Sequence, residues 1–413
     1  MRILYDIVFF FFSFLYLPFF FIQGKHRGGF LQRFGVVPKR EREQLAGKKV
    51  IWVHAVSVGE MSQAVRFAQE LKRRIESTTI VLTATTVAGK ELAEKLKAPD
   101  DVVLYFPIDF RCCVRSFIRV VQPRVLAILE TEIWPNLICE LSAKKIPVFI
   151  VNGRLSDRAI QGYRRVRFFL KAILNRLTQA AVQDHEMRGR FIKLGMDQRR
   201  VTVTGNMKFD WTPPLSGHDV VEKIREGFLK PGTLLMVAGS THEGEEEILF
   251  KLFKSVRPKY PGFKILIATR HLNRLESIEA KAASMNIPIN EGVLLLNQMG
   301  VLANVYRLAD LVFMGGSLVP VGGHNLAEPA FFEKPILFGP FMQNFKEMAE
   351  IFKNQQAAIQ VRDGEDLEKI VLSLAGDEHR RRALGLAAKK LLGAHQGATE
   401  KNVQMIFKEL QKK

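Results

Sequence analysis

Short runs of β-branched and other apolar residues alternate along the chain with longer stretches in which apolar residues recur every three or four positions. The short runs predict strands, and the stretches of about 12 to 18 residues predict helices. Because the two kinds of element alternate, the pattern indicates βαβ units and parallel sheets. The expected strands form two series. The first is Val50–His54, Thr79–Thr83, Val102–Phe106, Val125–Leu129, Val148–Val151, Ala180–Gln183 and Val201–Thr204, and the second is Leu234–Ala238, Lys264–Ala268, Val293–Leu296, Leu311–Met314, Pro335–Phe338 and Ala358–Val361.

A segment with Pro213, Pro214 and Gly217 separates the two series, between Asp210 and Asp219, and predicts a linker. The length of 413 residues also suits two domains. We expect an α/β protein with two doubly wound, Rossmann-like domains at residues 25–212 and 229–395, a linker at 213–228, and a C-terminal helix at 396–413 that packs back towards the first domain. Ligands bind at the carboxyl ends of strands in such sheets, so we expect a cleft between the domains.

The N-terminus has a different pattern, which predicts a membrane anchor at residues 1–24. Leu4 to Ile22 is dominated by Phe, Leu, Ile and Val, with Asp6, Ser13 and Pro18 as interruptions. About 20 apolar residues are needed to cross a bilayer. Only Arg2 precedes the stretch and no small-residue cleavage site follows, which argues against a signal peptide. The basic residues that follow predict a cytoplasmic location for the domains: they are Lys25, His26, Arg27 and Arg33. An anchor that spans the bilayer and one that lies in a single leaflet both remain open.

The charge and the cysteines narrow the possible partners. A formal net charge of +19 calls for an anionic partner. No zinc-ligand spacing, helix-turn-helix cue or aromatic RNA-binding signature is present, so nucleic acid is not expected. Anionic membrane lipid explains the charge at least as well. The three cysteines form no metal or redox motif, and their scarcity fits a reducing cytosol: they are Cys112, Cys113 and Cys139.

The stretch from Gly315 to Pro329 is the strongest functional signal of the second series. Two glycine pairs follow the expected strand Leu311–Met314, and a helix is expected to begin at His324 or Asn325. Glycine lets backbone N–H groups approach a ligand, and a helix start suits a phosphate. Glu328 would then accept hydrogen bonds from a ribose diol. The segment predicts a nucleotide site. The alternative is a turn that only packs a helix tightly onto a sheet.

The first series has a corresponding motif from Trp52 to Glu60. The expected strand runs into a short turn with Gly59, and a helix is expected to begin near Met61 and to continue to about Glu76. Glu60 would stand at the mouth of the sheet, where a carboxylate can act as a general base. The alternative is that Glu60 only complements the dipole of the helix in its first turn.

Other expected strands also end in polar residues. Glu130 and Glu132 follow one strand directly, and two acids at this spacing are hard to explain as structure alone. In the second series Thr269, Arg270 and His271 end a strand, where the Arg270 guanidinium can pair with a phosphate or, alternatively, with a protein carboxylate. No Asp-x-Asp element follows a strand, so we expect no metal. The further strand-end candidates are Ser156, Arg158 and Lys208.

Taken together, these motifs resemble those of the 3-deoxy-D-manno-octulosonic acid (Kdo) transferases, glycosyltransferase family 30. The resemblance runs over nearly the whole chain, in the same order. It covers the apolar N-terminus, His54–Glu60, Glu130–Asn136, Asn152–Ser156 with Gly162-Tyr163, Gly205–Asp210, Ala238–His242, Arg270-His271 and Gly322–Pro329. It implies the two-domain GT-B fold and an enzyme of the inner membrane that lies on its cytoplasmic face. Such an enzyme moves Kdo from CMP-Kdo onto the acylated, phosphorylated lipid A precursor, without a cofactor or metal.

The resemblance also implies roles for individual residues. Glu60 is the implied general base, with inversion at the anomeric carbon, and Glu130 and Lys208 support the transition state. The implied CMP-binding residues are Gly59, Thr269, Arg270, Met299, Gly300, Val301, Gly322, Gly323, His324, Asn325, Leu326, Ala327 and Glu328. The candidates on the acceptor side are Ser57, Thr85, Glu132, Arg154, Ser156, Arg158 and Arg164. The family commonly has an acidic residue where this chain has Val301, and a Gly-Asp pair where it has Asn297-Gln298, which puts a side-chain role at 301 in doubt.

A basic and aromatic segment between Arg154 and Arg190, with Tyr163, Arg164 and Phe168, suggests contact with lipid phosphate and acyl chains. A solvated basic helix face is the alternative. Three rival functions remain open: a GT-B transferase that uses a UDP-sugar on another lipid, a sugar-nucleotide epimerase of the same fold, and a non-enzymatic basic membrane scaffold.

Overall fold

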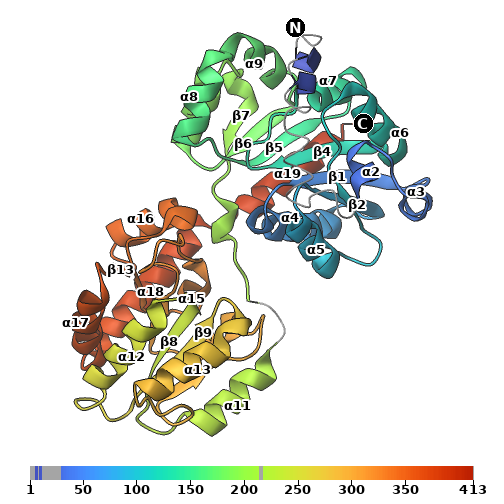
Figure 1. The fold of residues 1–413 in the computed structure, drawn as a ribbon. Helices are drawn as coiled ribbons and strands as arrows, with labels where there is room; N and C mark the ends of the chain where they lie inside the picture. Colours follow the sequence, from blue (N-terminus) through green and yellow to red (C-terminus); the bar gives the residue numbers. More distant parts are fainter. Residues whose placement is uncertain (1–4, 8, 12–28, 214–216, 413) are drawn as a thin grey trace. The chain divides into compact units, whose positions relative to one another are not determined.

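The computed structural model describes residues 5–7, 9–11, 29–213 and 217–412. They form two compact units, each built around one parallel sheet (Figure 1). Unit 1 comprises residues 1–210 and 396–413, and unit 2 comprises residues 211–395. All thirteen expected strands are present, seven in the first sheet and six in the second. The alternating pattern therefore predicted the fold class correctly.

The sheet of unit 1 has the strand order β3-β2-β1-β4-β5-β6-β7, with every neighbouring pair parallel. Its strands are β1 (Lys49–Ala55), β2 (Thr78–Ala84), β3 (Val102–Tyr105), β4 (Pro123–Leu129), β5 (Val148–Gly153), β6 (Gln179–Val182) and β7 (Val201–Val203). Its helices are α2 (Phe30–Arg33), α3 (Lys39–Leu45), α4 (Val58–Arg74), α5 (Val87–Leu96), α6 (Arg111–Val121), α7 (Pro135–Ala143), α8 (Asp157–Arg165), α9 (Arg167–Leu174), α10 (His185–Lys193) and α19 (Ala398–Leu410), with 3-10 turns η1 (Gln198–Arg200) and η2 (Met207–Phe209).

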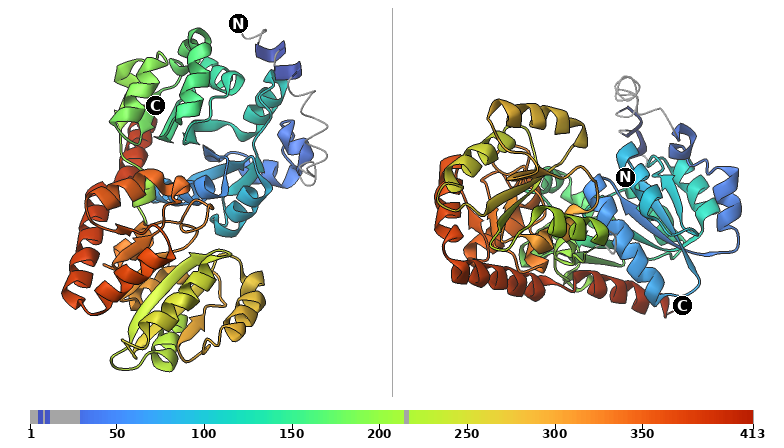
Figure 2. Two further views of the ribbon diagram at one scale, coloured as in Figure 1. Left: turned by 60° about the vertical axis from the view of Figure 1, so that its left-hand side comes forward. Right: turned by 90° about the horizontal axis from the view of Figure 1, so that it is seen from below.

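Helices cover both faces of this sheet, so its strands are apolar on both sides (Figures 1 and 2). Alternate residues of β1 belong to two different cores: Val50 and Trp52 to one, Ile51 and Val53 to the other. The C-terminal helix α19 packs in unit 1, against α4 and the strands β4 and β5. The sheet and its two helical layers hold the strand ends, and hence the site residues, in fixed positions.

The sheet of unit 2 repeats the topology, in the order β10-β9-β8-β11-β12-β13, and all its neighbouring pairs are parallel. Its strands are β8 (Leu234–Thr241), β9 (Phe263–Thr269), β10 (Val293–Leu295), β11 (Leu311–Met314), β12 (Ile336–Phe338) and β13 (Ile359–Gln360). Its helices are α11 (His218–Phe228), α12 (Glu245–Val256), α13 (Leu275–Ser284), α14 (Leu302–Val305), α15 (Ala327–Phe331), α16 (Lys346–Asn354), α17 (Gly364–Ala375) and α18 (Glu378–His395), with 3-10 turns η3 (Leu272–Arg274), η4 (Tyr306–Leu308) and η5 (Gln343–Phe345).

The structure corrects the expected linker at 213–228. Its second half is the helix α11, which packs against α14 within unit 2. Val221, Ile224 and Phe228 are buried at spacings of three and four residues, the pattern of an amphipathic helix. The prolines and the glycine before this helix predicted a linker, and the helical spacing after them was missed.

The expected anchor, Leu4 to Ile22, lies mostly outside the described residues. Residues 5–7 and 9–11 are helical, and they lie against unit 1. The Tyr5 hydroxyl donates a hydrogen bond of 2.9 Å to Asp109, and the Tyr5 ring stacks on Phe169. In the part of the chain that the structure describes, no helix has both the length and the hydropathy needed to span a membrane.

Candidate active site

The carboxylate of Glu60 is held at the start of α4, where β1 ends. Its Oε2 accepts a hydrogen bond of 2.9 Å from the backbone N–H of Val56, and its Oε1 accepts one of 2.9 Å from the Ser57 hydroxyl. In return, the backbone N–H of Glu60 donates to Ser57 Oγ at 3.2 Å. This arrangement is a variant of the capping box, in which the Glu60 carboxylate reaches the N–H of Val56 instead of the N–H of the N-cap residue Ser57, and it starts the helix at Val58 rather than near Met61. Both sequence interpretations of Glu60 are thus compatible: the side chain caps the helix and stands at the mouth of the sheet.

Glu130 and Glu132, which follow β4, lie within electrostatic range of Glu60. Burial raises the pKa of Glu130, and the charge of Glu60 adds to the effect, while Lys208 and Arg154 lower the pKa. Burial raises the pKa of Glu132 to about 7, again with contributions from Glu60 and from Glu130. The three carboxyl groups therefore lie close together at the carboxyl ends of β1 and β4.

Lys208 belongs to the same cluster because Asn152 holds its turn in place. Asn152 ends β5 with φ +57 and is fully buried. Its Oδ1 accepts a hydrogen bond of 3.0 Å from the N–H of Met207, and its Nδ2 donates one of 3.1 Å to Gln63 on α4. Asn206 caps the same 3-10 turn through a hydrogen bond of 3.0 Å from the N–H of Lys208. The sequence motif contained Asn152, but its bridging position required the structure.

The acceptor-side candidates surround this cluster to different degrees. Ser156 caps α8 by accepting from Ala159 at 3.1 Å, and Arg158 and Arg164 are exposed on that helix. The N–H of Arg154 donates to Thr131 at 3.1 Å, next to Glu132. Tyr163, on α8, lies close enough to Glu132 for that carboxylate to help raise the pKa of the phenol, after burial as the larger cause. The backbone oxygen of Thr85, directly after β2, accepts a hydrogen bond of 2.8 Å from the Arg33 guanidinium.

In unit 2 the first glycine pair does not offer the free N–H groups that the sequence analysis expected. The carboxylate of Glu245, on α12, accepts hydrogen bonds from the N–H groups of Gly316 at 2.7 Å, Ser317 at 3.0 Å and Leu318 at 3.0 Å. Glu245 is 0% exposed. The turn after β11 is therefore filled by an acceptor from the chain itself, which spacing along the sequence could not show.

The second glycine pair is constrained by packing. Gly322 and Gly323 have φ values of +112 and +69, and a Cβ atom would lie 2.5 Å from the Asn344 amide and 2.2 Å from Met342 Sδ respectively. The N–H of Gly323 donates to Gly316 O at 2.8 Å. Packing alone therefore requires glycine at both positions, and the nucleotide contact expected at this pair stays a prediction.

The helix expected at His324 or Asn325 begins instead at Ala327 and has only five residues. Asn325 Oδ1 accepts a hydrogen bond of 3.0 Å from the N–H of Ala327. This local turn delays the start of the helix relative to the expected position. Leu326 and Ala327 are buried, while Glu328 is half-buried, near the buried Tyr306 hydroxyl.

Three histidines and an arginine come together at the carboxyl ends of β8, β9 and β11. The Nε2 atoms of His242 and His324 are 3.1 Å apart, and the His271 ring meets the His242 ring edge-on, with 5.8 Å between centroids. Burial lowers the pKa of His324 to about 4, and the positive charge of Arg270 lowers it further. Within the described residues Arg270 forms no ion pair with a carboxylate, whereas its neighbour Arg274 pairs with Glu246 at 2.9 Å. The sequence motifs indicated no individual binding role for His242 or His271.

The remaining donor-side candidates lie nearby along the chain but differ in exposure. Thr269 is buried at the end of β9 and donates to Thr241 O at 3.4 Å. Met299 is 57% exposed, and Gly300 adopts φ +82 with open space around it. Val301 is 3% exposed and packs against Gly217. Its side chain thus lies in the interior of unit 2.

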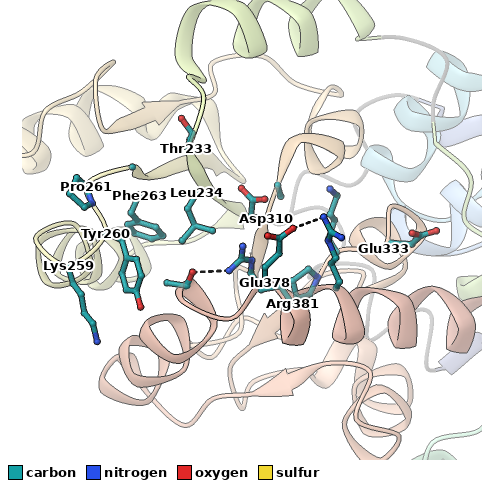
Figure 3. A pocket seen from close by; sticks show the side chains of 17 residues that line it. Thr233, Leu234, Lys259, Tyr260, Pro261, Phe263, Asp310, Glu333, Glu378 and Arg381 are labelled. Carbon is teal, nitrogen blue, oxygen red and sulfur yellow. Dashed lines mark hydrogen bonds and ion pairs between the residues drawn. The ribbon is translucent and has the colours of Figure 1, made fainter.

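No group of three His, Cys, Asp or Glu side chains among the described residues is placed to hold a metal ion. A cavity of about 680 Å³ opens at the opposite end of the second sheet, where the strands β8, β9, β11 and β12 begin (Figure 3). Its walls include Lys259, Asp310 and Glu378, and Arg381 donates to the Ala375 carbonyl there. Because the strands are parallel, this cavity is at the end of the sheet away from Arg270 and the histidines.

Comparison with known proteins identifies the family of the chain. Residues 28–211 match the family "3-Deoxy-D-manno-octulosonic-acid transferase (kdotransferase)". The 3-deoxy-D-manno-octulosonic acid transferase of Haemophilus influenzae is 31% identical over 370 residues, which cover 86% of each chain. A bifunctional glycosyltransferase/methyltransferase of Fusobacterium nucleatum is also 31% identical, over 81% of this chain, but the chain spans only 54% of that relative's length.

Solved structures add the fold. The UDP-GlcNAc 2-epimerase of Neisseria meningitidis bound to UDP-GlcNAc matches 87% of this chain and 100% of its own, with a TM-score of 0.60 and 13% identity. A glycosyltransferase of Rickettsia africae matches 89% of this chain and 99% of its own, with a TM-score of 0.58 and 13% identity. Both show a GT-B-like pair of α/β units. Because the Haemophilus influenzae relative is 31% identical over 86% of each chain, the chain belongs to the 3-deoxy-D-manno-octulosonic acid transferase family and is a glycosyltransferase.

Proposed function

We propose that the enzyme transfers Kdo from CMP-Kdo onto the acylated, phosphorylated disaccharide precursor of lipid A, with inversion and without a metal. The observation that carries the proposal is the cluster of Glu60, Glu130, Glu132 and Lys208 at the carboxyl ends of one sheet. Membership in the family makes Kdo the sugar, and the resemblance supplies the donor and the acceptor. This route belongs to lipopolysaccharide synthesis.

Glu60 is the base in this mechanism. Each of its oxygens accepts one hydrogen bond from the chain, which fixes the carboxylate and leaves lone pairs for a substrate hydroxyl. The acceptor hydroxyl gives its proton to Glu60, its oxygen forms the new bond to the anomeric carbon, and the bond from that carbon to the phosphate breaks. The bonding electrons leave with CMP. Attack from the face opposite CMP inverts the configuration.

Glu130 and Lys208 support the transition state by charge. Burial and the charge of Glu60 raise the pKa of Glu130, whereas the charge of Lys208 lowers it. Lys208 and Glu130 are therefore close enough to interact electrostatically. A fixed ammonium and a carboxyl group beside the reacting carbon stabilise the charge that separates as CMP leaves. Glu132, whose pKa is raised to about 7, is partly protonated at neutral pH and can donate a hydrogen bond to an acceptor sugar.

In unit 2 the donor phosphate is assigned to side chains. Arg270, which pairs with no carboxylate in the described part of the chain, and the row His242, His271 and His324 surround one position at the strand ends. A guanidinium can grip two phosphate oxygens at once. Glu328, in the first turn of α15, is assigned to the ribose hydroxyls.

The helices α8 and α9 supply a surface for the cytoplasmic face of the inner membrane. Phe168 is 83% exposed and Val166 is 49% exposed, which is unusual for apolar side chains, and Arg164, Arg165 and Arg167 flank them. None of these arginines forms an ion pair within the described residues. An amphipathic surface of this kind binds anionic lipid. Phe10 and Phe11, in the N-terminal segment expected to anchor the chain, are also more than half exposed.

The membrane assignment is tested with Arg164→Glu combined with Arg165→Glu. We expect weaker sedimentation with vesicles of anionic phospholipid and a higher KM for the lipid acceptor, because each basic residue near such a surface contributes about 1 kcal/mol. Charge reversal of Arg380, on α18 of unit 2, serves as the control. Unchanged binding and unchanged KM in the double variant would remove these helices from the membrane contact.

The function itself is tested with full-length enzyme, CMP-Kdo and a tetra-acylated lipid A precursor, with product masses read by mass spectrometry. The expected products are CMP and the precursor with one or more added Kdo units. Parallel reactions with UDP-hexosamine donors test the UDP-sugar transferase, and an assay for epimerised UDP-sugar tests the alternative that the shared fold raises. Release of UDP, or epimerisation without transfer, would overturn the proposal.

A further inference from the structure

The Glu245 carboxylate occupies a nest of backbone N–H groups. Its Oε1 accepts from Ser317 and Leu318 at 3.0 Å each, and its Oε2 accepts from Gly316 at 2.7 Å and from His242 at 2.9 Å. All four partners are donors, so this side chain acts only as an acceptor. Successive N–H groups in such a turn commonly bind an external anion. Here the anion is part of the protein.

One of these four donors, His242, belongs to the histidine row, and a second, Gly316, lies against two rings of that row. Gly316 has φ +64, and a Cβ atom on it would lie 3.1 Å from His242 Cδ2 and 3.3 Å from His324 Cδ2. Both imidazole rings therefore pack over the bare glycine, which Glu245 holds from the other side. The rings are nearly parallel, with an interplanar angle of 11°, and their Nε2 atoms are 3.1 Å apart. A hydrogen bond between these atoms requires one ring with a proton on Nε2 and the other with an Nε2 lone pair.

The same carboxylate also fixes the beginning of this row at His242. The neighbouring residue Thr241 accepts the N–H of Arg270 at 3.0 Å through its backbone oxygen. Its hydroxyl donates to Glu246 at 2.8 Å, and Glu246 pairs with Arg274. The adjacent acids Glu245 and Glu246 thus hold the two sides of the β8 end: one sets the histidine pair and the other sets the base of the Arg270 loop.

We propose that Glu245 is a positioning residue for the donor: it fills the glycine turn, sets the His242–His324 pair beside Arg270, and so directs the donor phosphate to these side chains instead of the turn. The inference deepens the proposed function and rests on it for the identity of the ligand as CMP. It explains why a glycine turn after a central strand carries a buried acid.

The test measures CMP binding to the full-length enzyme by calorimetry. Glu245→Gln keeps the shape of the side chain but turns an N–H₂ group towards N–H donors, which leaves buried groups unpaired. We expect CMP affinity to fall about tenfold or more, which corresponds to ~1.4 kcal/mol. The KM for CMP-Kdo should rise while the KM for the lipid acceptor stays unchanged. Glu247→Gln is the matched control, because Glu247 lies on the same helix but pairs with Lys251 and Lys281 at the surface.

A second variant keeps the proposal testable if Glu245→Gln does not fold. Gly316→Ala leaves Glu245 intact but places a methyl group against both imidazole rings. It should cause the same loss of CMP affinity. The imidazole ¹⁵N signals of His242 and His324, read without ligand, should show the loss of the shared hydrogen bond in either variant.

Two results would overturn the inference. One is CMP affinity within twofold of wild type in every variant that folds. The other is unchanged imidazole signals. Should wild-type enzyme fail to bind CMP, the proposed function falls, whereas the ligand-free imidazole spectra still decide whether Glu245 positions the histidine pair.

Discussion

The N–H of Met207 donates a hydrogen bond of 3.0 Å to the buried side chain of Asn152. Because Asn152 also donates to Gln63 on α4, one side chain joins the helix that begins with the Glu60 cap to the turn that carries Lys208. An asparagine near the end of β5 therefore links the position of Glu60, the proposed base, to that of the turn with Lys208.

Asn152→Ala should lower both stability and turnover. The change leaves the buried N–H of Met207 without its acceptor, which costs about 1–3 kcal/mol, and the left-handed backbone at φ +57 adds to the loss. Urea unfolding and kcat would measure the two effects. Asn286→Ala is the control, since Asn286 has φ +52 but is exposed in unit 2. Equal loss of turnover in both variants would contradict the bridging role.

Glu60→Gln should lower kcat by ~10² to 10⁴, the usual range for a lost general base. Stability should change little, because glutamine also completes a capping box. The contrasting variant is Ser57→Ala, which removes the cap but keeps the carboxylate. It should lower the free energy of unfolding by about 0.5–2 kcal/mol and leave turnover within about tenfold of wild type. Turnover of Glu60→Gln close to that of wild type would exclude Glu60 as the base.

The sequence predicted the strands of both sheets and most of the residues at their carboxyl ends, because alternation of apolar runs and helices is a local property. Contacts between segments were less accessible. The donor for Asn152 comes from 55 residues further along the chain, and three of the four donors for Glu245 come from more than 70 residues away. The helix start at Val58 was missed because it depends on the cap Ser57, and the start at Ala327 because Asn325 accepts the N–H of Ala327 in the turn before the helix.

Glu132→Gln should stabilise the protein at neutral and alkaline pH. The folded protein raises the pKa of Glu132 to about 7. Between the unfolded value near 4.5 and 7, the folded state holds more protons than the unfolded state, so this group makes wild-type stability fall as pH rises. The variant lacks that dependence, and its advantage over wild type should grow from pH 4.5 to 7 to a value on the order of 1–3 kcal/mol. Urea unfolding at pH 5 and pH 8 measures it, and an advantage that is the same at both would refute the shift.

His324→Gln should flatten the loss of stability in acid. Because the pKa of His324 is lowered to about 4, the unfolded state binds more protons between pH 6.5 and 4, and wild-type stability falls as pH falls through this window. The ligand-free variant should lose less free energy of unfolding between pH 7 and 5 than wild type does. His379→Gln, at an exposed position on α18, should leave the pH profile unchanged. If the free energy of unfolding fell equally with pH in His324→Gln and in wild type, folding would not lower the pKa of His324.

The C-terminal helix α19 lies in unit 1, although unit 2 separates it in the chain from the rest of that unit. Its residues Asn402, Val403 and Ile406 are buried there, and Asp210 holds its first turn through the N–H groups of Gly397 and Thr399. A growing chain therefore cannot finish unit 1 on the ribosome until all of unit 2 has been translated. Unit 2, although it comes later, is the first that can complete its own fold, and until synthesis ends the nascent first unit exposes the apolar groove that α19 later fills.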